Sequence, residues 1–153
     1  MAPSTGPTSQ SIADGRLMLK KPHLEFLGNP PTVDISYGPG NSILIHNPQR
    51  RQEFLKKVLP PQGTPLTDAE DFVDRRLGSG STEIPVDDQG RIRIDKVYLV
   101  RSGLTEKGAT AYLLPRIGDG WIEVWNEEGY RDSFDNRKDE WREALSALAL
   151  KSR

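Results

Sequence analysis

Short stretches in which apolar and polar residues alternate, separated by glycine or proline, run through most of the chain. At residues 91–94 the order is Arg-Ile-Arg-Ile, so a strand here would turn both isoleucines to a core and Arg91 and Arg93 to the opposite face. The two arginines would lie about 7 Å apart on that face. Gly90 stands just before the strand and supplies the positive φ that a hairpin loop with a bulge needs. The pattern predicts a tight turn followed by a strand with two arginines on its polar face.

A short helix is predicted after this strand, and the whole pattern occurs twice. Asp95 is a good N-cap and Gly103 a good residue to end a helix, so residues 96–102 are expected to be helical. Residues 13–28 match residues 88–103 in register. The identical positions of the first copy are Gly15, Arg16, Lys21, Leu24 and Gly28. Two copies of one unit are therefore predicted, each with a hairpin strand, a short helix, a second hairpin and an amphipathic helix.

The other elements follow from turn and cap signals. Asn47 followed by Pro48 begins a helix, and Thr67 with Glu70 forms a capping box for another. The expected elements are hairpins that pair 32–37 with 42–45 and 110–114 with 121–125, and helices over 48–59, 68–77 and from Arg137 onward. The last helix is expected to pack against its own core or a neighbour through apolar residues at helical spacing, which are Trp141, Ala144, Leu145 and Leu148.

These elements divide the chain into five parts. Residues 1–10, rich in proline, serine, threonine and glycine, are expected to be disordered. The first unit is expected over 11–59, a linker with a connecting helix over 60–80, the second unit over 81–134, and a C-terminal helix over 135–153. A chain of 153 residues can bury one core or two small cores that share an interface, and the repeat favours two.

Composition narrows the class of protein. The chain has 35% hydrophobic and 28% charged residues, no cysteine, and no apolar run long enough to span a membrane. The start of the sequence has no apolar signal segment, so a globular cytoplasmic protein is expected. The formal net charge of -1 argues against general affinity for nucleic acid. Any DNA binding must therefore come from arginines that are gathered locally.

No residue pattern predicts catalysis, a cofactor, a metal or a small-molecule substrate. His23 and His46 fall in different elements and have no nucleophile or ligand at motif spacing. Asp87 and Asp88 are adjacent, which turns their side chains to opposite faces or into the turn. The acidic residues of 68–74 match the favourable charge at a helix N-terminus. The chain is therefore not expected to be an enzyme.

The second copy resembles a known family. The order GSGSTEIPVDDQGRIRI, SGL and GDGWIEVW is similar to the second half of MraZ, a family of bacterial transcriptional regulators built from two domains related to AbrB. The family signature is an aspartate, three residues and an arginine, with glycine before the arginine, and it is matched from Asp87 to Arg91. In the first copy Ile12 occupies the aspartate position and Asp14 precedes the glycine. The resemblance covers about residues 10–145.

The resemblance implies a fold and a function. The fold would be α+β, with two tandem AbrB/MraZ-like swapped-hairpin β domains in a pseudo-twofold arrangement with flanking helices. The chain would be a sequence-selective regulator that binds double-stranded DNA as a ring-like homo-oligomer, near the nucleoid, on promoter repeats of cell division and cell wall genes. Arg91 and Arg93 would be the main DNA-facing residues, with Arg16 and Lys20 as weaker equivalents. The turns would be shaped by Asp87, Gly90 and Gly15.

Three questions stay open on the sequence alone. Asp87 can lock the hairpin by pairing with Arg91, can orient Arg91 towards DNA, or can do both. The chain can also be an oligomeric scaffold or partner-binding module of the same fold, because the changes at Ile12 and Asp14 would weaken DNA binding. The aromatic strand 121–125 can stack on bases, but a place in the core or in a subunit interface is favoured, since no arginine is interleaved with it.

Overall fold

The computed structural model describes residues 7–106, 108–135 and 138–151. The first repeat contains β1 (Thr8–Ser11), β2 (Arg16–Met18), α1 (Lys21–Phe26), β3 (Thr32–Tyr37), β4 (Ile43–His46) and α2 (Pro48–Val58). The connection contains α3 (Asp68–Val73) and the π-helical segment η1 (Asp74–Ser79). The second repeat contains β5 (Thr82–Pro85), β6 (Arg91–Arg93), α4 (Lys96–Ser102), β7 (Thr110–Arg116), β8 (Trp121–Trp125), α5 (Glu127–Tyr130) and the π-helical segment η2 (Arg131–Asp135). Helix α6 (Lys138–Lys151) follows, and the α+β class is confirmed.

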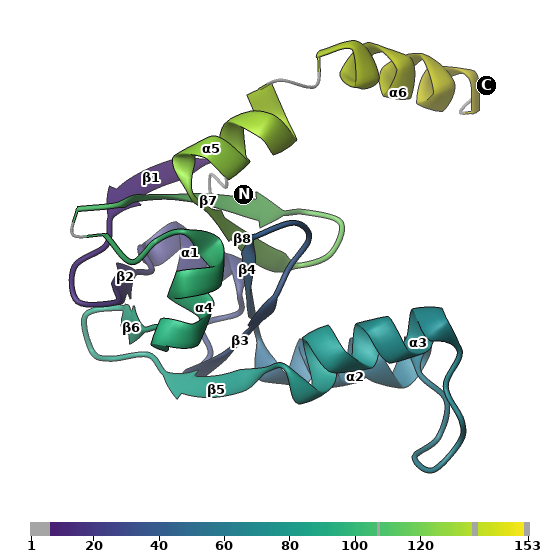
Figure 1. Cartoon of the computed structure of the whole chain (residues 1–153), viewed down its shortest axis with the longest axis horizontal. Helices are drawn as coiled ribbons and strands as arrows, with labels where there is room; N and C mark the ends of the chain where they lie inside the picture. The colour runs from purple at the N-terminus through teal and green to yellow at the C-terminus, as the bar shows by residue number, and fades with distance from the viewer. Residues whose placement is uncertain (1–6, 107, 136–137, 152–153) are drawn as a thin grey trace.

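Six strands form one antiparallel sheet, and the remaining two form a separate ribbon (Figure 1). The sheet order is β1-β7-β8-β4-β3-β5, with the hairpins β3–β4 and β7–β8 joined at the centre through β4 and β8. The first strand of each repeat pairs with the hairpin of the other repeat, β1 with β7 and β5 with β3. The order is symmetric: replacing each strand by its counterpart in the other repeat gives the same order, read from the opposite edge of the sheet. The repeat in the sequence is therefore also a repeat in the sheet.

The short helices α1 and α4 are tied to these strands in matching ways. His23 of α1 lies with its Nε2 3.2 Å from the Thr8 hydroxyl of β1. Tyr98, the aligned residue of α4, lies with its hydroxyl 2.9 Å from the Thr82 hydroxyl of β5. Both rings are buried. Each repeat thus uses one polar-tipped ring to hold its helix against its own first strand.

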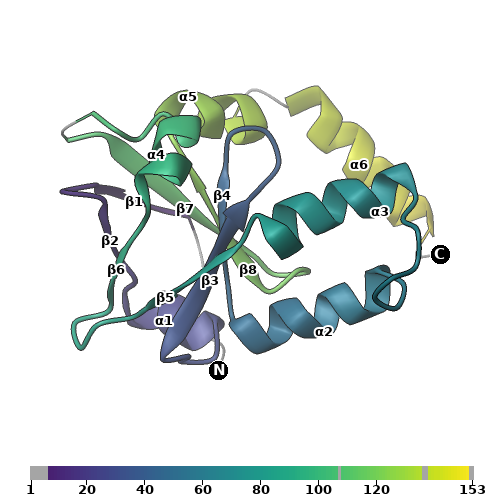
Figure 2. The same ribbon diagram turned by 60° about the horizontal axis from the view of Figure 1, so that its bottom comes forward.

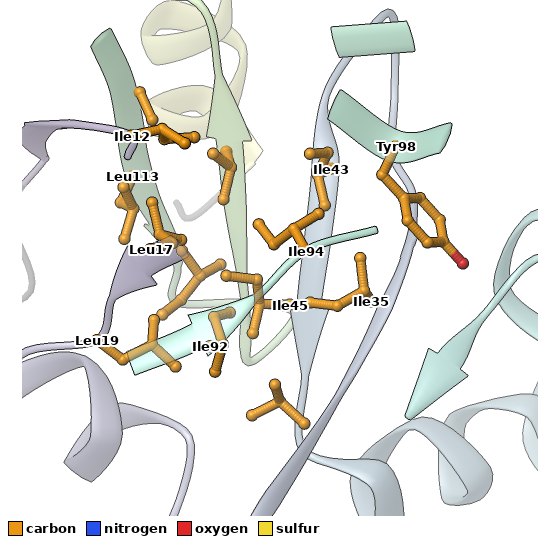
Figure 3. Packing of buried hydrophobic residues seen from close by; sticks show 14 of the residues in the cluster. Ile12, Leu17, Leu19, Ile35, Ile43, Ile45, Ile92, Ile94, Tyr98 and Leu113 are labelled. Carbon is orange, nitrogen blue, oxygen red and sulfur yellow. The ribbon is translucent and has the colours of Figure 1, made fainter. Parts of the chain in front are cut away.

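Buried side chains from both repeats form one core (Figure 3). Leu17 of β2 and Ile92 of β6 meet there with Ile35, Ile45 and Leu113, and none of the five is more than 1% exposed. Each such side chain stabilises the fold by about 1.5–3 kcal/mol relative to an exposed one. The prediction of two small cores is wrong, because Leu17 and Ile92 pair across the β2–β6 ribbon and lie in one cluster with side chains from the hairpins of both repeats.

The ends of the chain also differ from the sequence-based predictions. Residues 1–6 and Arg137 lie outside the described residues. Disorder is the wrong prediction for residues 8–10, because they belong to β1 and pair through their backbone with β7. Helix α6 is confirmed as a helix, but it does not pack on the core. Its apolar side chains Trp141, Leu145 and Leu148 are 63%, 47% and 62% exposed.

Most helices begin and end where the cap signals predict. Asn47 accepts hydrogen bonds from the first turn of α2, and Thr67 with Glu70 forms the capping box of α3. Gly103 ends α4 with φ of +70°, whereas Asp95 occupies its N-cap position without a capping side-chain hydrogen bond. Helices α2 and α3 extend together to one side of the sheet (Figure 2). In the part of the chain that the structure describes, no helix is long and apolar enough to cross a membrane.

Candidate nucleic-acid interface

The β2–β6 ribbon brings arginines from both repeats to one exposed face. The antiparallel register pairs Arg16 with Arg93, Leu17 with Ile92, and Met18 with Arg91. Because neighbouring residues of a strand point to opposite faces and the central pair is buried in the core, the other two pairs face outward. Arg16, Arg91 and Arg93 therefore lie on the same face of one two-stranded element. The predicted alternation within 91–94 is confirmed, and the sequence-based prediction did not include its pairing with the first repeat.

Arg16 and Arg93 are direct cross-strand neighbours. The Ile94 N–H donates to the Gly15 carbonyl at 2.8 Å, so the inward-facing positions carry the ladder bonds and Arg16–Arg93 is a non-hydrogen-bonded pair. In such pairs the side chains stand close, and like charges directly opposite each other are destabilising. Both arginines are exposed, and neither has an ion-pair or hydrogen-bond partner for its guanidinium among the described residues. A bound anion would remove this repulsion.

Asp87 and Gly90 build the turn that leads into β6. The backbone N–H groups of Arg91 and Gln89 donate to Asp87 Oδ1 at 2.8 and 2.9 Å, and Arg91 Nε donates to Asp87 Oδ2 at 2.9 Å. These bonds, that from the Arg91 backbone above all, lower the pKa of the Asp87 carboxyl below its usual range. Gly90 has φ of +81°, and a Cβ there would stand 2.5 Å from the Leu19 carbonyl oxygen. The predicted glycine turn is confirmed, and the Asp87–Arg91 pair locks it.

The ion pair with Asp87 holds the Arg91 side chain but does not occupy all of its donors. Its side chain is 39% exposed, and its Nε is the donor that contacts Asp87. A guanidinium carries five N–H donors in a fixed plane, so donors remain for a ligand while the carboxylate fixes the orientation of the plane. The geometry is compatible with both roles of Asp87, locking the hairpin and orienting Arg91.

The first repeat makes a different turn. Ile12, which aligns with Asp87, is 4% exposed and contributes to the core. Asp14 and Gly15 have φ of +54° and +72°, as in the Asp-Gly turns of two-residue hairpins, and the Arg16 N–H donates across the turn at 2.9 Å. The predicted turn role of Gly15 is confirmed. In the part of the chain that the structure describes, no carboxylate clamps Arg16 as Asp87 clamps Arg91.

Both ends of the ribbon carry cations beside carboxylates. Lys20, two residues after the end of β2, is exposed and lies at the end where the Leu19 N–H donates to the Gly90 carbonyl, next to the turn that carries Asp87 and Asp88. At the other end Asp14 and Asp95 line, together with Arg93, a groove of about 880 Å³. A polyanion would be attracted by the arginines and Lys20 and repelled by the carboxylates at both ends.

Two of the four cations of α2, Arg50 and Arg51, are engaged within the protein. Arg51 of α2 forms an ion pair with Asp34 at 2.5 Å, with the two side chains 16% and 2% exposed. Arg50 donates to the Phe26 carbonyl at 2.9 Å. Two arginines of α2 thus bind groups within the protein. The β2–β6 ribbon is the better candidate for a ligand-facing surface.

A buried polar group in the first hairpin was missed by the sequence-based predictions. Ser36 Oγ lies 2.9 Å from His46 Nε2, and both residues, with Asp34, are less than 5% exposed. Burial, and then the charge of Arg51, lowers the pKa of His46 to about 3. Serine, histidine and aspartate are the residue types of a hydrolytic triad. However, Ser36 is 0% exposed, so this group holds the hairpin together and offers a substrate no access. Polar residues within two otherwise apolar strands were the signal for it.

The aromatic side chains of strand β8 pack against other residues of the protein. Trp125 is 8% exposed and its Nε1 donates to Glu123 Oε1 at 3.0 Å. Trp121 packs edge-on against His46 and Phe54, with ring centroids 5.1 and 5.8 Å away. The expectation of a core role for this strand is confirmed, and the strand does not form a base-stacking platform.

Comparisons with known proteins add no identification. Neither the models of known protein families nor the curated protein sequences give a match to this chain. Within residues 7–106, 108–135 and 138–151, no group of three or more histidine, cysteine, aspartate or glutamate residues could hold a metal ion.

Proposed function

We propose that this chain is a sequence-selective DNA-binding transcriptional regulator similar to MraZ, which acts as a homo-oligomer on promoter repeats of cell division and cell wall genes. The two repeats would be AbrB-like swapped-hairpin domains related by a pseudo-twofold axis. The exchange of β1 and β5 between the hairpins and the pairing of β2 with β6 support this arrangement. The match of residues 87–91 to the family signature supports it independently. The proposal includes no catalytic residue and no cofactor.

The observation that carries the proposal is the exposed Arg16–Arg93 pair. A two-stranded β-ribbon fits the major groove of B-DNA, where arginine can bind guanine O6 and N7 with two hydrogen bonds. Arginine can bind phosphate in the same two-bonded way. Arg16 and Arg93 would supply such contacts at one end of the ribbon, and Arg91 and Lys20 would supply contacts towards its other end.

Assembly explains how a chain of net charge -1 could bind DNA. One protomer offers a few cations near two carboxylates, so its own affinity would be weak. Several protomers joined in a ring would bind repeated sites together, and each further contact would benefit from a high effective concentration. The affinity would still fall steeply with salt, because every phosphate contact releases counterions.

A second candidate function is an oligomeric scaffold or partner-binding module of the same fold. Asp14 and Asp95 beside Arg93 favour it, because carboxylates repel the phosphate backbone. Light scattering of the protein with and without the DNA upstream of its own gene separates the two. A regulator is expected to give a mass of several 17.1 kDa chains and a heavier complex with DNA. A single-chain mass that the DNA leaves unchanged would contradict both the assembly and the DNA binding.

The site itself is tested by fluorescence anisotropy with the same DNA and the variant Arg93→Ala. For each bound protomer we expect about tenfold weaker binding and a salt slope that is smaller by about 1. Arg75→Ala is the matched control, since it removes the same charge from an exposed side chain paired with Asp71 on the α3 side of the molecule. Identical titrations of wild type and Arg93→Ala at two salt concentrations would exclude the ribbon as the DNA-binding surface.

A further inference from the structure

One outward-facing position of the β2–β6 ribbon is not an arginine. Met18 stands opposite Arg91 in the register, on the face that also presents Arg16 and Arg93. We propose that Met18 is a specificity-determining residue that contacts the 5-methyl group of a thymine in the major groove. The inference rests on the proposed DNA-binding function and names a base that the ribbon reads.

The repeat shows that Met18 departs from the ribbon's own pattern. Arg16 aligns with Arg91, and Met18 aligns with Arg93, so strict repetition would place four arginines on this face. Met18 is also not a core residue. The core-facing side chain of β2 is Leu17, which is 0% exposed, whereas Met18 lies on the other face and is only partly buried. An apolar side chain thus interrupts a cationic face at one position.

The backbone of Met18 is fixed by a contact that the second repeat lacks. The side chain of Gln10 in β1 donates to the Met18 carbonyl at 2.8 Å and accepts from the Met18 N–H at 2.7 Å. These are the backbone groups that point away from β6, because Met18 and Arg91 form a non-hydrogen-bonded pair. The residue aligned with Gln10 is Pro85, which has no amide side chain to do this. The strand is therefore held in place at the position where the side chain is apolar.

The chemistry of the groove indicates what such a side chain would meet. Among the base edges in the major groove, the thymine methyl is the apolar group, and apolar side chains contact it. The flexible, polarisable thioether of methionine adapts well to such a surface. Successive outward-facing residues of a strand are about 7 Å apart, close to two base-pair steps of about 3.4 Å. Met18 would read a thymine about two steps from the base or phosphate that Arg16 contacts.

The test uses the upstream DNA of the gene in two forms, one normal and one in which every thymine is replaced by deoxyuridine. The replacement removes methyl groups and leaves hydrogen-bonding groups and charges in place. Wild type is expected to bind the uracil duplex about fourfold more weakly for each bound protomer, the effect of removing one methyl group from a buried interface. Met18→Ala is expected to bind both duplexes equally, and Met18→Leu and the control Arg75→Ala are expected to keep the difference.

Each other outcome overturns a defined part of the inference. Equal binding of wild type to the two duplexes overturns the methyl contact and leaves the proposed function standing. A difference that persists in Met18→Ala shows that another residue reads the methyl group, which also overturns the inference. Binding to neither duplex overturns the proposed function and the inference with it. The wild-type comparison needs no variant, so a fold defect in Met18→Ala does not affect it.

Discussion

The two repeats differ most at the turns that lead into the shared ribbon. In the second repeat, Asp87 accepts three hydrogen bonds and holds Arg91. In the first repeat, the aligned Ile12 is buried, and Arg16 leaves a shorter turn with no such clamp. Loss of the aspartate therefore changes the turn but does not take the arginine away from the surface. The register even places Arg16 directly opposite Arg93, so the divergent repeat contributes to the same site as the repeat that matches the family signature.

The largest expected effect comes from the ion pairs that hold the two hairpins. Arg51→Ala would leave the buried Asp34 without its partner, and we expect a loss of about 3–5 kcal/mol in the free energy of unfolding. Arg116→Ala in the second hairpin is the matched variant. We expect it to cost only about 1–2 kcal/mol, since Arg116 is 44% exposed and the buried Glu123 keeps its hydrogen bond from Trp125 Nε1. Urea unfolding of the two variants gives both values, and equal losses would contradict the contrast.

The pH dependence of stability should come mainly from the first repeat, which holds both histidines. The pKa of His46 is lowered to about 3, and burial also lowers the pKa of His23. The unfolded chain therefore takes up protons near pH 6.5 that the folded chain refuses, so stability is highest above this pH and falls as the pH drops towards 3. We expect a loss on the order of 3 kcal/mol between pH 7 and pH 4 from His46. In His46→Gln, urea unfolding should show a much smaller loss of stability between pH 7 and pH 4. An unchanged loss would show that other groups cause the pH dependence.

The two turn glycines should respond unequally to substitution. Gly90→Ala would place a Cβ 2.5 Å from a carbonyl oxygen at φ of +81°, and we expect a loss of about 2–3 kcal/mol. Gly15→Ala meets its nearest backbone oxygen at 3.1 Å, so a smaller loss of about 1–2 kcal/mol is expected. Thermal unfolding of both variants measures the difference. A larger loss for Gly15→Ala would show that the first turn is the more constrained one.

The smallest expected contrast concerns DNA affinity. The sequence favours Arg91 over Arg16, because Arg91 belongs to the full signature. The structure favours the opposite order, since Asp87 already neutralises part of the charge of Arg91 while Arg16 faces Arg93. We expect about a tenfold loss for Arg16→Ala and about a threefold loss for Arg91→Ala in anisotropy titrations. A clearly larger loss for Arg91→Ala would restore the order that the sequence favours.

Local features of this fold could be predicted from the sequence, and long-range pairings could not. Turns and helix caps involve only a residue's own backbone or the adjacent turn, so they can be predicted from a few neighbouring residues, as at Gly90, Asn47 and Thr67. The pairing of β2 with β6 joins residues far apart in the chain, and a three-residue alternation does not say which strand it meets. Strand β1 was missed because residues 8–11 are all polar and are held by backbone bonds to β7.

The candidate site was predictable in part for the same reason. The alternation around Arg93 correctly predicts which way its side chain faces, since this depends on β6 alone. The closeness of Arg16 and the partly buried place of Met18 depend on the register between the repeats. The two hydrogen bonds between the Gln10 side chain and the Met18 backbone depend on the position of β1, which could not be predicted from the sequence.

The most direct test of the central claim is the salt dependence of DNA binding by wild type and by the double variant Arg16→Ala/Arg93→Ala. The claim is that the two repeats join their arginines on one ribbon that binds a polyanion. It predicts that the slope of log K against log salt becomes smaller by about 2 for each protomer bound to the DNA, roughly 0.9 for each phosphate that the variant no longer neutralises. The control Arg75→Ala/Arg131→Ala, which removes the same charge from exposed side chains elsewhere, should keep the wild-type slope. An unchanged slope in Arg16→Ala/Arg93→Ala would contradict the account.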